Sequence, residues 1–245
     1  VARPFASCKW RRGVKLCDPA MGGAVFLLAV VKELDRQGFS RALLFEAVYG
    51  VDKSAPAVEA ARFAFALLGA PVKMLTSHLC LGNSLFPKDH PQSAGILDSQ
   101  FDLIIGNPPW VSFSGRQKEE LDEELKAILE QSYGSFQSSP GRSWPSLHGA
   151  FLERMAGLLS DGGRLGVLFP AQVTDLEGYR STRLQVEKFT GPPQSIWDLG
   201  EDAFPGVASP VVFAIFDCQD ESRSKSKGET WLQAPIPYDP DNPDE

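Results

Sequence analysis

Residues 101–110 of the chain, FDLIIGNPPW, join a short apolar run to a turn that contains two prolines. A short apolar run bounded by turn residues is typical of a buried strand in a parallel sheet. The tetrapeptide NPPW, residues 107–110, follows at the carboxyl end of that predicted strand. Ligands of open α/β sheets bind beyond the carboxyl ends of the strands, so this turn is a candidate for the functional site.

Upstream of this stretch, apolar runs and turn residues alternate as they do in βαβ units. The expected elements are a strand over 14–17, a helix over 23–37, a strand ending near Val51, a helix over 54–69 and a strand over 78–81. Ser54 with Pro56 is a typical helix start, and Gly69 is a typical helix end. The pattern predicts the α/β class, with a Rossmann-like, doubly wound and mostly parallel sheet.

Downstream of it, the alternation continues and then changes. The expected elements are a charged helix over 115–133, a loop over 132–146, a helix over 147–159 and a strand over 164–169. Two further apolar runs, 195–199 and 211–216, are predicted to pair as an antiparallel hairpin at the sheet edge. We therefore expect one catalytic domain over 1–220, followed by a terminal strand and an acidic, proline-rich tail over 221–245.

Composition limits the classes of function. The chain has 245 residues, 43% of them hydrophobic, which is enough for a substantial core. Its formal net charge of −7 argues against holding a long DNA backbone unaided, because such binding uses many Lys and Arg contacts. The four cysteines and three histidines are scattered, which predicts neither a metal site nor a disulfide framework. The longest apolar run, 24–31, is too short to span a bilayer and no signal peptide opens the chain, so we expect a cytoplasmic protein without membrane contact.

Small or polar residues follow each of the first three predicted strands. The turn DPAMGGA, residues 18–24, lacks bulky side chains and lets a ligand approach the backbone closely. Asp52 ends the second strand, where an acidic side chain accepts hydrogen bonds from both ribose hydroxyls of a nucleoside. Asn83 follows the third strand and can bond to an adenine ring beside it. Each of these signals alone is shared with dinucleotide enzymes and with ordinary structural turns.

Taken in order, the motifs resemble those of the N6-adenine-specific DNA methyltransferases with an NPPW or NPPY loop, in the class whose cofactor motif precedes the catalytic one. DPAMGGAVFL resembles their cofactor loop, VYGVD the ribose-binding acid, LGNSLF the adenine-contact turn and IIGNPPW the catalytic loop. The match continues through FLERMAGLLSDGGRLGVLFP and DLGEDAFPGVASPVVFAIF. The resemblance implies S-adenosylmethionine as cofactor, bound by Asp18, Pro19, Ala20, Gly22, Asp52 and Asn83.

The resemblance also implies the reaction, which is methyl transfer to the N6 amino group of adenine in DNA. The Asn107 side-chain oxygen and the Pro108 carbonyl can accept both amino protons, which turns the nitrogen lone pair toward the methyl group. Pro108 and Pro109 fix the backbone, while positioning and preorganised dipoles supply much of the rate. The base must be flipped out of the duplex. Trp110 offers it one stacking face, and the resemblance implies Phe204 on the other side.

The cofactor loop departs from the family pattern at three positions. Met21 stands where cysteine is usual, Gly23 replaces serine, and Ala24 lies where the family has its second glycine. We expect the methyl group of Ala24 to crowd the cofactor and lower its affinity. Asn83 replaces a carboxylate that is frequent at the adenine-contact turn, and it can still accept a hydrogen bond.

Two alternatives to adenine methylation stay open. A methyltransferase acting on the N5 amide of protein glutamine also places an NPP-aromatic loop on this fold, although Trp110 and the AFPG segment favour adenine. The other alternative is a degenerate S-adenosylmethionine-fold module that serves binding or assembly. If adenine is the target, we expect DNA to be bound through a target-recognition region outside this chain. We also expect partner subunits of a restriction-modification or phage-defence complex.

Overall fold

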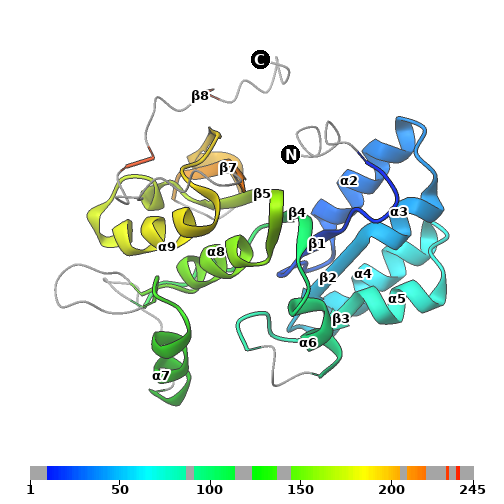
Figure 1. Cartoon of the computed structure of the whole chain (residues 1–245), viewed down its shortest axis with the longest axis horizontal. Coiled ribbons are helices and arrows are strands. Elements are labelled where there is room, and N and C mark those ends of the chain that lie inside the picture. Colours follow the sequence, from blue (N-terminus) through cyan, green and yellow to red (C-terminus); the bar gives the residue numbers. More distant parts are fainter. Residues whose placement is uncertain are drawn as a thin grey trace. The chain divides into compact units, whose positions relative to one another are not determined.

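The computed structural model of the chain describes residues 10–86, 91–113, 123–136, 145–204, 209–218, 230–231 and 236–237. The chain forms two compact units, and Figure 1 labels most of their helices and strands. The first unit comprises residues 1–107 and 158–164, and the second comprises residues 108–157 and 165–245. Strand β5 (Leu159–Pro170) begins in the first unit and ends in the second.

The first unit is built on a parallel sheet. Its strands are β1 (Leu16–Asp18), β2 (Val48–Asp52), β3 (Leu79–Leu81) and β4 (Phe101–Gly106). They lie in the order β3-β2-β1-β4, and each neighbouring pair is parallel. The chain therefore adds β2 and β3 on one side of β1 and then crosses to add β4 on the other. The carboxyl ends of β1 and β4 flank this switch point, which is where open α/β sheets bind their ligands.

Helices connect these strands. They are α2 (Val25–Arg36), α3 (Arg41–Ala47), α4 (Ala55–Leu67), α5 (Val72–His78) and α6 (Pro91–Leu97). At the start of α4 the Ser54 side chain accepts a hydrogen bond from the Ala57 N–H, and Gly69 follows the helix with a φ of 87°. The expected helix over 54–69 is therefore confirmed.

The second unit holds the remaining strands. They are the end of β5, then β6 (Ser195–Gly200), β7 (Val211–Asp217) and β8 (Ile236–Pro237), in the order β5-β7-β6-β8. β6 and β7 pair antiparallel, with Trp197 opposite Phe213, which confirms the predicted hairpin. β8 pairs parallel with β6, so the hairpin does not form the outer edge. The mostly parallel sheet with the antiparallel β6–β7 pair confirms the predicted fold class.

The described helices of this unit are α7 (Glu123–Ser132), α8 (Leu147–Gly157), α9 (Arg180–Thr190) and three short 3-10 helices at Ala171–Val173, Glu177–Tyr179 and Glu201–Ala203. α7 confirms the second half of the helix expected over 115–133. Residues 114–122 and 137–144, from that helix and the predicted loop, lie outside the described residues, as does most of the tail over 221–245. Within the described ranges, every helix is too short or too polar to cross a membrane.

The boundaries of three elements differ from expectation. The first strand lies over Leu16–Asp18 rather than 14–17. β5 begins at Leu159 rather than at 164, so the preceding helix ends at Gly157 and not at 159. Asp-Gly-Gly at 161–163 suggests a turn, but β5 passes close to β4 here. A Cβ at Gly163 would lie 3.1 Å from the carbonyl oxygens of both Phe101 and Asp102, so glycine permits the close approach.

Candidate cofactor and catalytic site

The cofactor turn begins with a buried carboxyl group. Asp18 is the last residue of β1, and only 1% of it is exposed. Its Oδ1 accepts a hydrogen bond from the Ala20 N–H at 3.0 Å, while its Oδ2 has no hydrogen-bond partner in the described structure. Burial raises the pKa of Asp18 to about 7; the Ala20 N–H opposes this rise, and the negative charge of Asp52 adds to it.

The backbone of the turn is tied to the end of β2. The Met21 N–H donates to the Val51 carbonyl at 3.1 Å, and the Gly22 N–H donates to Asp52 Oδ2 at 2.9 Å. Gly22 has a φ of 53° and Ala24 a φ of 62°, so the turn is left-handed at both positions. Ala24 is the one non-glycine residue with positive φ among those that the structure describes. The turn and Asp52 therefore form one hydrogen-bonded unit.

Asp52 and Asn83 stand at the ends of the next two strands, as expected. Asp52 Oδ1 accepts a hydrogen bond from the Ser54 N–H at 2.8 Å, in addition to the bond from Gly22. Asn83 Oδ1 accepts a hydrogen bond from the Leu85 N–H at 3.1 Å. Both residues are half-buried.

Ser84 is a residue of this site that the sequence did not single out. It is 2% exposed, and its hydroxyl donates to the Pro19 carbonyl at 2.5 Å. This bond joins the turn after β3 to the turn after β1. The six predicted cofactor residues therefore share the carboxyl edge of β1, β2 and β3, with Pro19 linked to Ser84 and Gly22 linked to Asp52.

Asn107 completes this edge of the first unit. It follows Gly106, the last residue of β4, and β4 pairs directly with β1. Its side chain is half-buried, and its Oδ1 is buried without a hydrogen-bond partner in the described structure. A buried acceptor without a hydrogen bond lowers the stability of the folded chain, and a ligand that supplies the missing donor removes this cost.

Pro108, Pro109 and Trp110, the other residues of the predicted catalytic turn, belong to the second unit. Trp110 contacts Phe204 there, with 5.7 Å between the ring centroids and an angle of 80° between the ring planes. The structure thus brings the two predicted stacking residues together. They meet edge to face, however, and do not present two parallel faces.

The segment after Trp110 is held by a polar cluster that the sequence did not predict. The Leu147 N–H donates to the Val111 carbonyl at 2.9 Å, and Ser112 forms an isolated bridge with Ser146. His148 is 2% exposed beneath this segment; burial lowers its pKa to about 4, which the Val111 carbonyl opposes. The His148 ring also packs against Tyr179, with ring centroids 5.3 Å apart.

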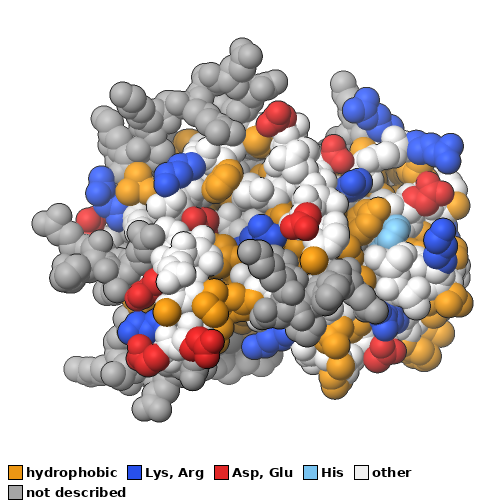
Figure 2. Space-filling model, turned by 60° about the horizontal axis from the view of Figure 1, so that its bottom comes forward, with side chains coloured by type: hydrophobic (Ala, Val, Ile, Leu, Met, Phe, Trp, Pro, Cys, Tyr) orange, Lys and Arg blue, Asp and Glu red, His pale blue; other side chains and the backbone are white. Residues whose placement is uncertain are grey.

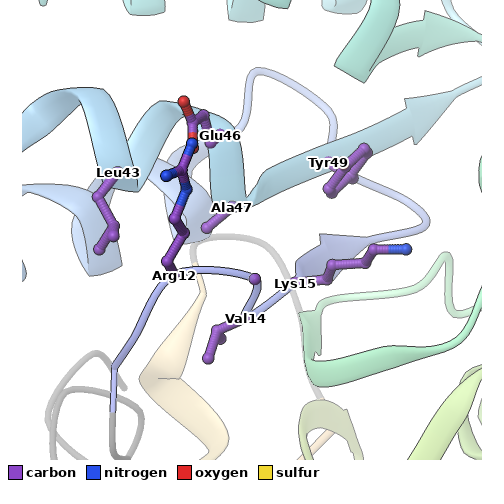
Figure 3. Close-up of a pocket in the computed structure, with 8 residues that line it drawn as sticks. Arg12, Val14, Lys15, Leu43, Glu46, Ala47 and Tyr49 are labelled. Carbon is purple, nitrogen blue, oxygen red and sulfur yellow. The ribbon is translucent and has the colours of Figure 1, made fainter.

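A cavity of about 200 Å³ lies elsewhere in the first unit (Figure 3). Its lining includes Arg12, Val14, Lys15, Glu46 and Tyr49. These residues precede or begin β1 and β2, so the cavity opens at the amino ends of the strands, away from Asp18. In Figure 3 the Arg12 and Glu46 side chains approach each other, while the Lys15 side chain points away from both. The cavity is distinct from the predicted cofactor edge.

In the part of the chain that the structure describes, no three His, Cys, Asp or Glu residues group as metal ligands.

Comparison with known protein families finds a match to one family. The sequence model of the family described as Eco57I restriction-modification methylase matches residues 46–200. The matched range includes Asp52, Asn83 and the NPPW turn, whereas the cofactor turn at 18–24 precedes it. No curated protein sequence matches the chain significantly.

Several solved structures share the fold. The M protein of the type I restriction enzyme EcoKI matches 94% of the chain with a TM-score of 0.63 and 16% identity. A nuclease-deletion mutant of the type ISP restriction-modification enzyme LlaGI, in complex with a DNA substrate mimic, matches 89% with a TM-score of 0.68 and 12% identity. A Listeria monocytogenes protein assigned to the class I S-adenosylmethionine-dependent methyltransferases matches 93% with a TM-score of 0.59 and 19% identity. The chain spans 45%, 22% and 60% of these three proteins, respectively.

Proposed function

The chain belongs to the Eco57I restriction-modification methylase family, and we propose that it transfers a methyl group to the N6 amino group of adenine in DNA. The position of Asn107 is the observation on which this proposal rests. It follows β4 beside the switch point of the sheet, and its Oδ1 is a buried acceptor without a donor in the described structure. An amino group of a ligand is the donor that such an oxygen lacks.

The methyl donor is S-adenosylmethionine, as the family and the fold imply. The residues of the first unit fit it. Each Asp52 oxygen accepts one backbone N–H, and a carboxylate oxygen accepts more than one hydrogen bond, so capacity remains for ribose hydroxyls. Asp18 adds a buried oxygen without a partner in the described structure, suited to a cationic group. When bound, the cofactor supplies an electrophilic methyl group on a sulfonium.

The protein's part in the proposed reaction is to orient the amino nitrogen. The lone pair of this nitrogen is delocalised into the adenine ring, which makes it a weak nucleophile. We assign Asn107 Oδ1 and the Pro108 carbonyl as acceptors of its two protons, so that the lone pair is freed for attack. Once the nitrogen is alkylated its proton is acidic and passes to water, and no strong base is required.

Trp110 and Phe204 are the proposed walls of the base site. A purine held between them gains about 1 to 3 kcal/mol of stacking free energy. Because their rings now meet at 80°, one ring must rotate before a base can lie between two parallel faces. Their direct contact supports a shared role.

We also propose that DNA is held by a target-recognition region outside this chain, together with partner subunits. The net charge of −7 supports this, because the acidic residues outnumber the basic ones and repel a phosphate backbone. The comparison with longer proteins supports it too, since the chain spans 45% of the EcoKI M protein. One of the similar structures, that of LlaGI, is in complex with a DNA substrate mimic.

The test of the proposed reaction identifies the methylated product. The chain is incubated with radiolabelled S-adenosylmethionine and either DNA or a glutamine-bearing protein, and the labelled residue is identified by mass spectrometry. We expect N6-methyladenine, and a loss of about 100-fold or more in the initial rate of methyl transfer at a fixed DNA concentration for Asn107→Ala with cofactor binding retained. Labelled glutamine, or a different labelled base, overturns the proposal. Cofactor binding without any transfer favours the alternative of a binding module.

A further inference from the structure

The carboxyl group of Asp18 lies in surroundings that do not support a negative charge. The residue is 1% exposed, one oxygen has a single backbone donor, and the other has no partner in the described structure. Burying an ionised carboxylate without a full set of donors costs several kcal/mol, so such a group retains its proton instead.

The neighbouring elements add no compensating cation. Asp52, at the end of β2, is the charged group that acts on Asp18, and its negative charge opposes ionisation. On β4, Asp102 accepts a hydrogen bond from the Lys15 N–H, at the other end of β1. Residues 19–24 of the turn are uncharged, and the first charged residue of α2 is Lys32, in its third turn. Among the described residues, the group found to favour the ionised form of Asp18 is the Ala20 N–H.

We infer that S-adenosylmethionine expels the proton of Asp18 on binding, so that a cationic centre of the cofactor takes the place of that proton. The cofactor has two such centres, its ammonium and its sulfonium. The O–H bond of the carboxyl group breaks, the proton passes to solvent, and the carboxylate then pairs with the cation. The inference rests on the identity of the cofactor and not on adenine as the target.

The direction of the pH dependence follows from the pKa of about 7 in the absence of cofactor. Below this pKa the cofactor must displace a proton, so its affinity falls by up to about tenfold for each pH unit. Above it the carboxyl group is already ionised, and this source of pH dependence vanishes. The α-amino group of the cofactor itself titrates near pH ~8, so the informative range lies below that value.

Isothermal titration calorimetry of the whole chain tests this directly. Titrations with S-adenosylmethionine at about pH 6 in phosphate and in Bis-Tris should differ in heat in proportion to the number of protons released, because the two buffers differ in ionisation enthalpy. We expect close to one proton released for each cofactor bound, and a dissociation constant about fivefold smaller when the pH is raised from about 6 to about 7. Asp18→Asn should abolish both effects, whereas Asp52→Asn should move the proton release to lower pH.

Asp102→Asn is the matched control, because it neutralises a carboxyl group at the other end of β1 and keeps an oxygen for the Lys15 N–H. It should release protons as the wild-type chain does. Equal heats in both buffers for the wild-type chain overturn the inference, whether or not the Asp18 variant folds. Proton release that persists in Asp18→Asn also overturns it. Absence of binding at every pH contradicts the cofactor assignment and the inference with it, while failure of DNA methylation alone affects only the proposed function.

Discussion

Two adjacent glycines of the cofactor turn differ in backbone conformation. Gly22 has a φ of 53°, and Gly23 has no positive φ; a Cβ at either position would meet no atom within 4 Å. A substitution by alanine therefore tests backbone strain without a steric clash. Because L-residues rarely adopt the left-handed region, we expect Gly22→Ala to lower the free energy of unfolding by about 1 kcal/mol.

Gly23→Ala is the natural control for that substitution. Its backbone suits an L-residue, so we expect a change within about 0.5 kcal/mol, or a slight gain because alanine restricts the unfolded chain. Urea unfolding monitored by tryptophan fluorescence measures both variants. Equal losses in the two would show that the conformation of Gly22 is not what requires glycine.

At the scale of single residues, the sequence predicted those site residues whose side chains suit a ligand and whose position is set by a recognisable strand. Asp18 and Asp52 are the last residues of their strands and Asn107 directly follows its strand, so parallel strands place the three on one edge. Ser84 was missed because a small hydroxyl residue in a turn has no distinctive pattern; only its bond to Pro19 reveals its role. The predicted stacking pair does meet, but neither pattern nor composition predicts the angle between two rings.

At the scale of elements, the helices that the sequence missed have two physical explanations. α3 ends at Ala47 and β2 begins at Val48, and α5 ends at His78 where β3 begins at Leu79. No turn residues separate either helix from its strand, so the sequence shows no boundary between them. α9 instead buries polar side chains, which hides its periodicity. Arg183 donates to the carbonyl groups of Val173 and Leu176, and Glu187 accepts from the Trp231 indole at 2.6 Å.

The start of α8 supplies a prediction of pH dependence. The pKa of His148 is about 4 in the folded chain and 6.5 in its unperturbed state. Between these values the unfolded chain binds a proton that the folded chain does not, so stability falls as the pH is lowered through this window. The loss amounts to about 3 kcal/mol. We expect His148→Phe, which keeps an aromatic ring against Tyr179, to lack this loss.

Thermal unfolding of the wild-type chain and the His148 variant at several pH values measures the difference. As the pH falls below about 6.5, the melting temperature of the wild-type chain should fall relative to that of the variant. A constant gap across this range would mean that His148 is not buried in its neutral form.

At the scale of the whole molecule, charge limits what the chain can bind alone. Figure 2 shows acidic and basic side chains interspersed over the face that it presents, and the formal net charge is −7. We therefore expect duplex DNA to bind with a dissociation constant weaker than about 10⁻⁴ M at physiological salt. Fluorescence anisotropy of a labelled duplex measures this, and micromolar binding with a steep salt dependence would disprove it. Such a result would place the DNA-holding surface within this chain.

Strand β5 makes the two units interdependent, because residues 159–164 belong to the first and 165–170 to the second. Unfolding of either unit removes part of a strand that the other requires. We therefore expect a single cooperative transition in calorimetry, although the two units contain groups with opposite pH dependence. Asp18 binds its proton more tightly in the folded chain, with a pKa of about 7 against an unperturbed 3.8, so its contribution to stability falls as the pH rises between these values.

The opposing contributions of Asp18 and His148 can be separated within that one transition. The loss from Asp18 on going from about pH 4 to 7 is about 3 kcal/mol, and it is offset by a gain of similar size from His148. The wild-type melting temperature should therefore change little over this range. It should rise with pH in Asp18→Asn and fall with pH in His148→Phe. Two separate transitions, each following the pH dependence of one group, would show instead that β5 does not couple the units and that each unfolds alone.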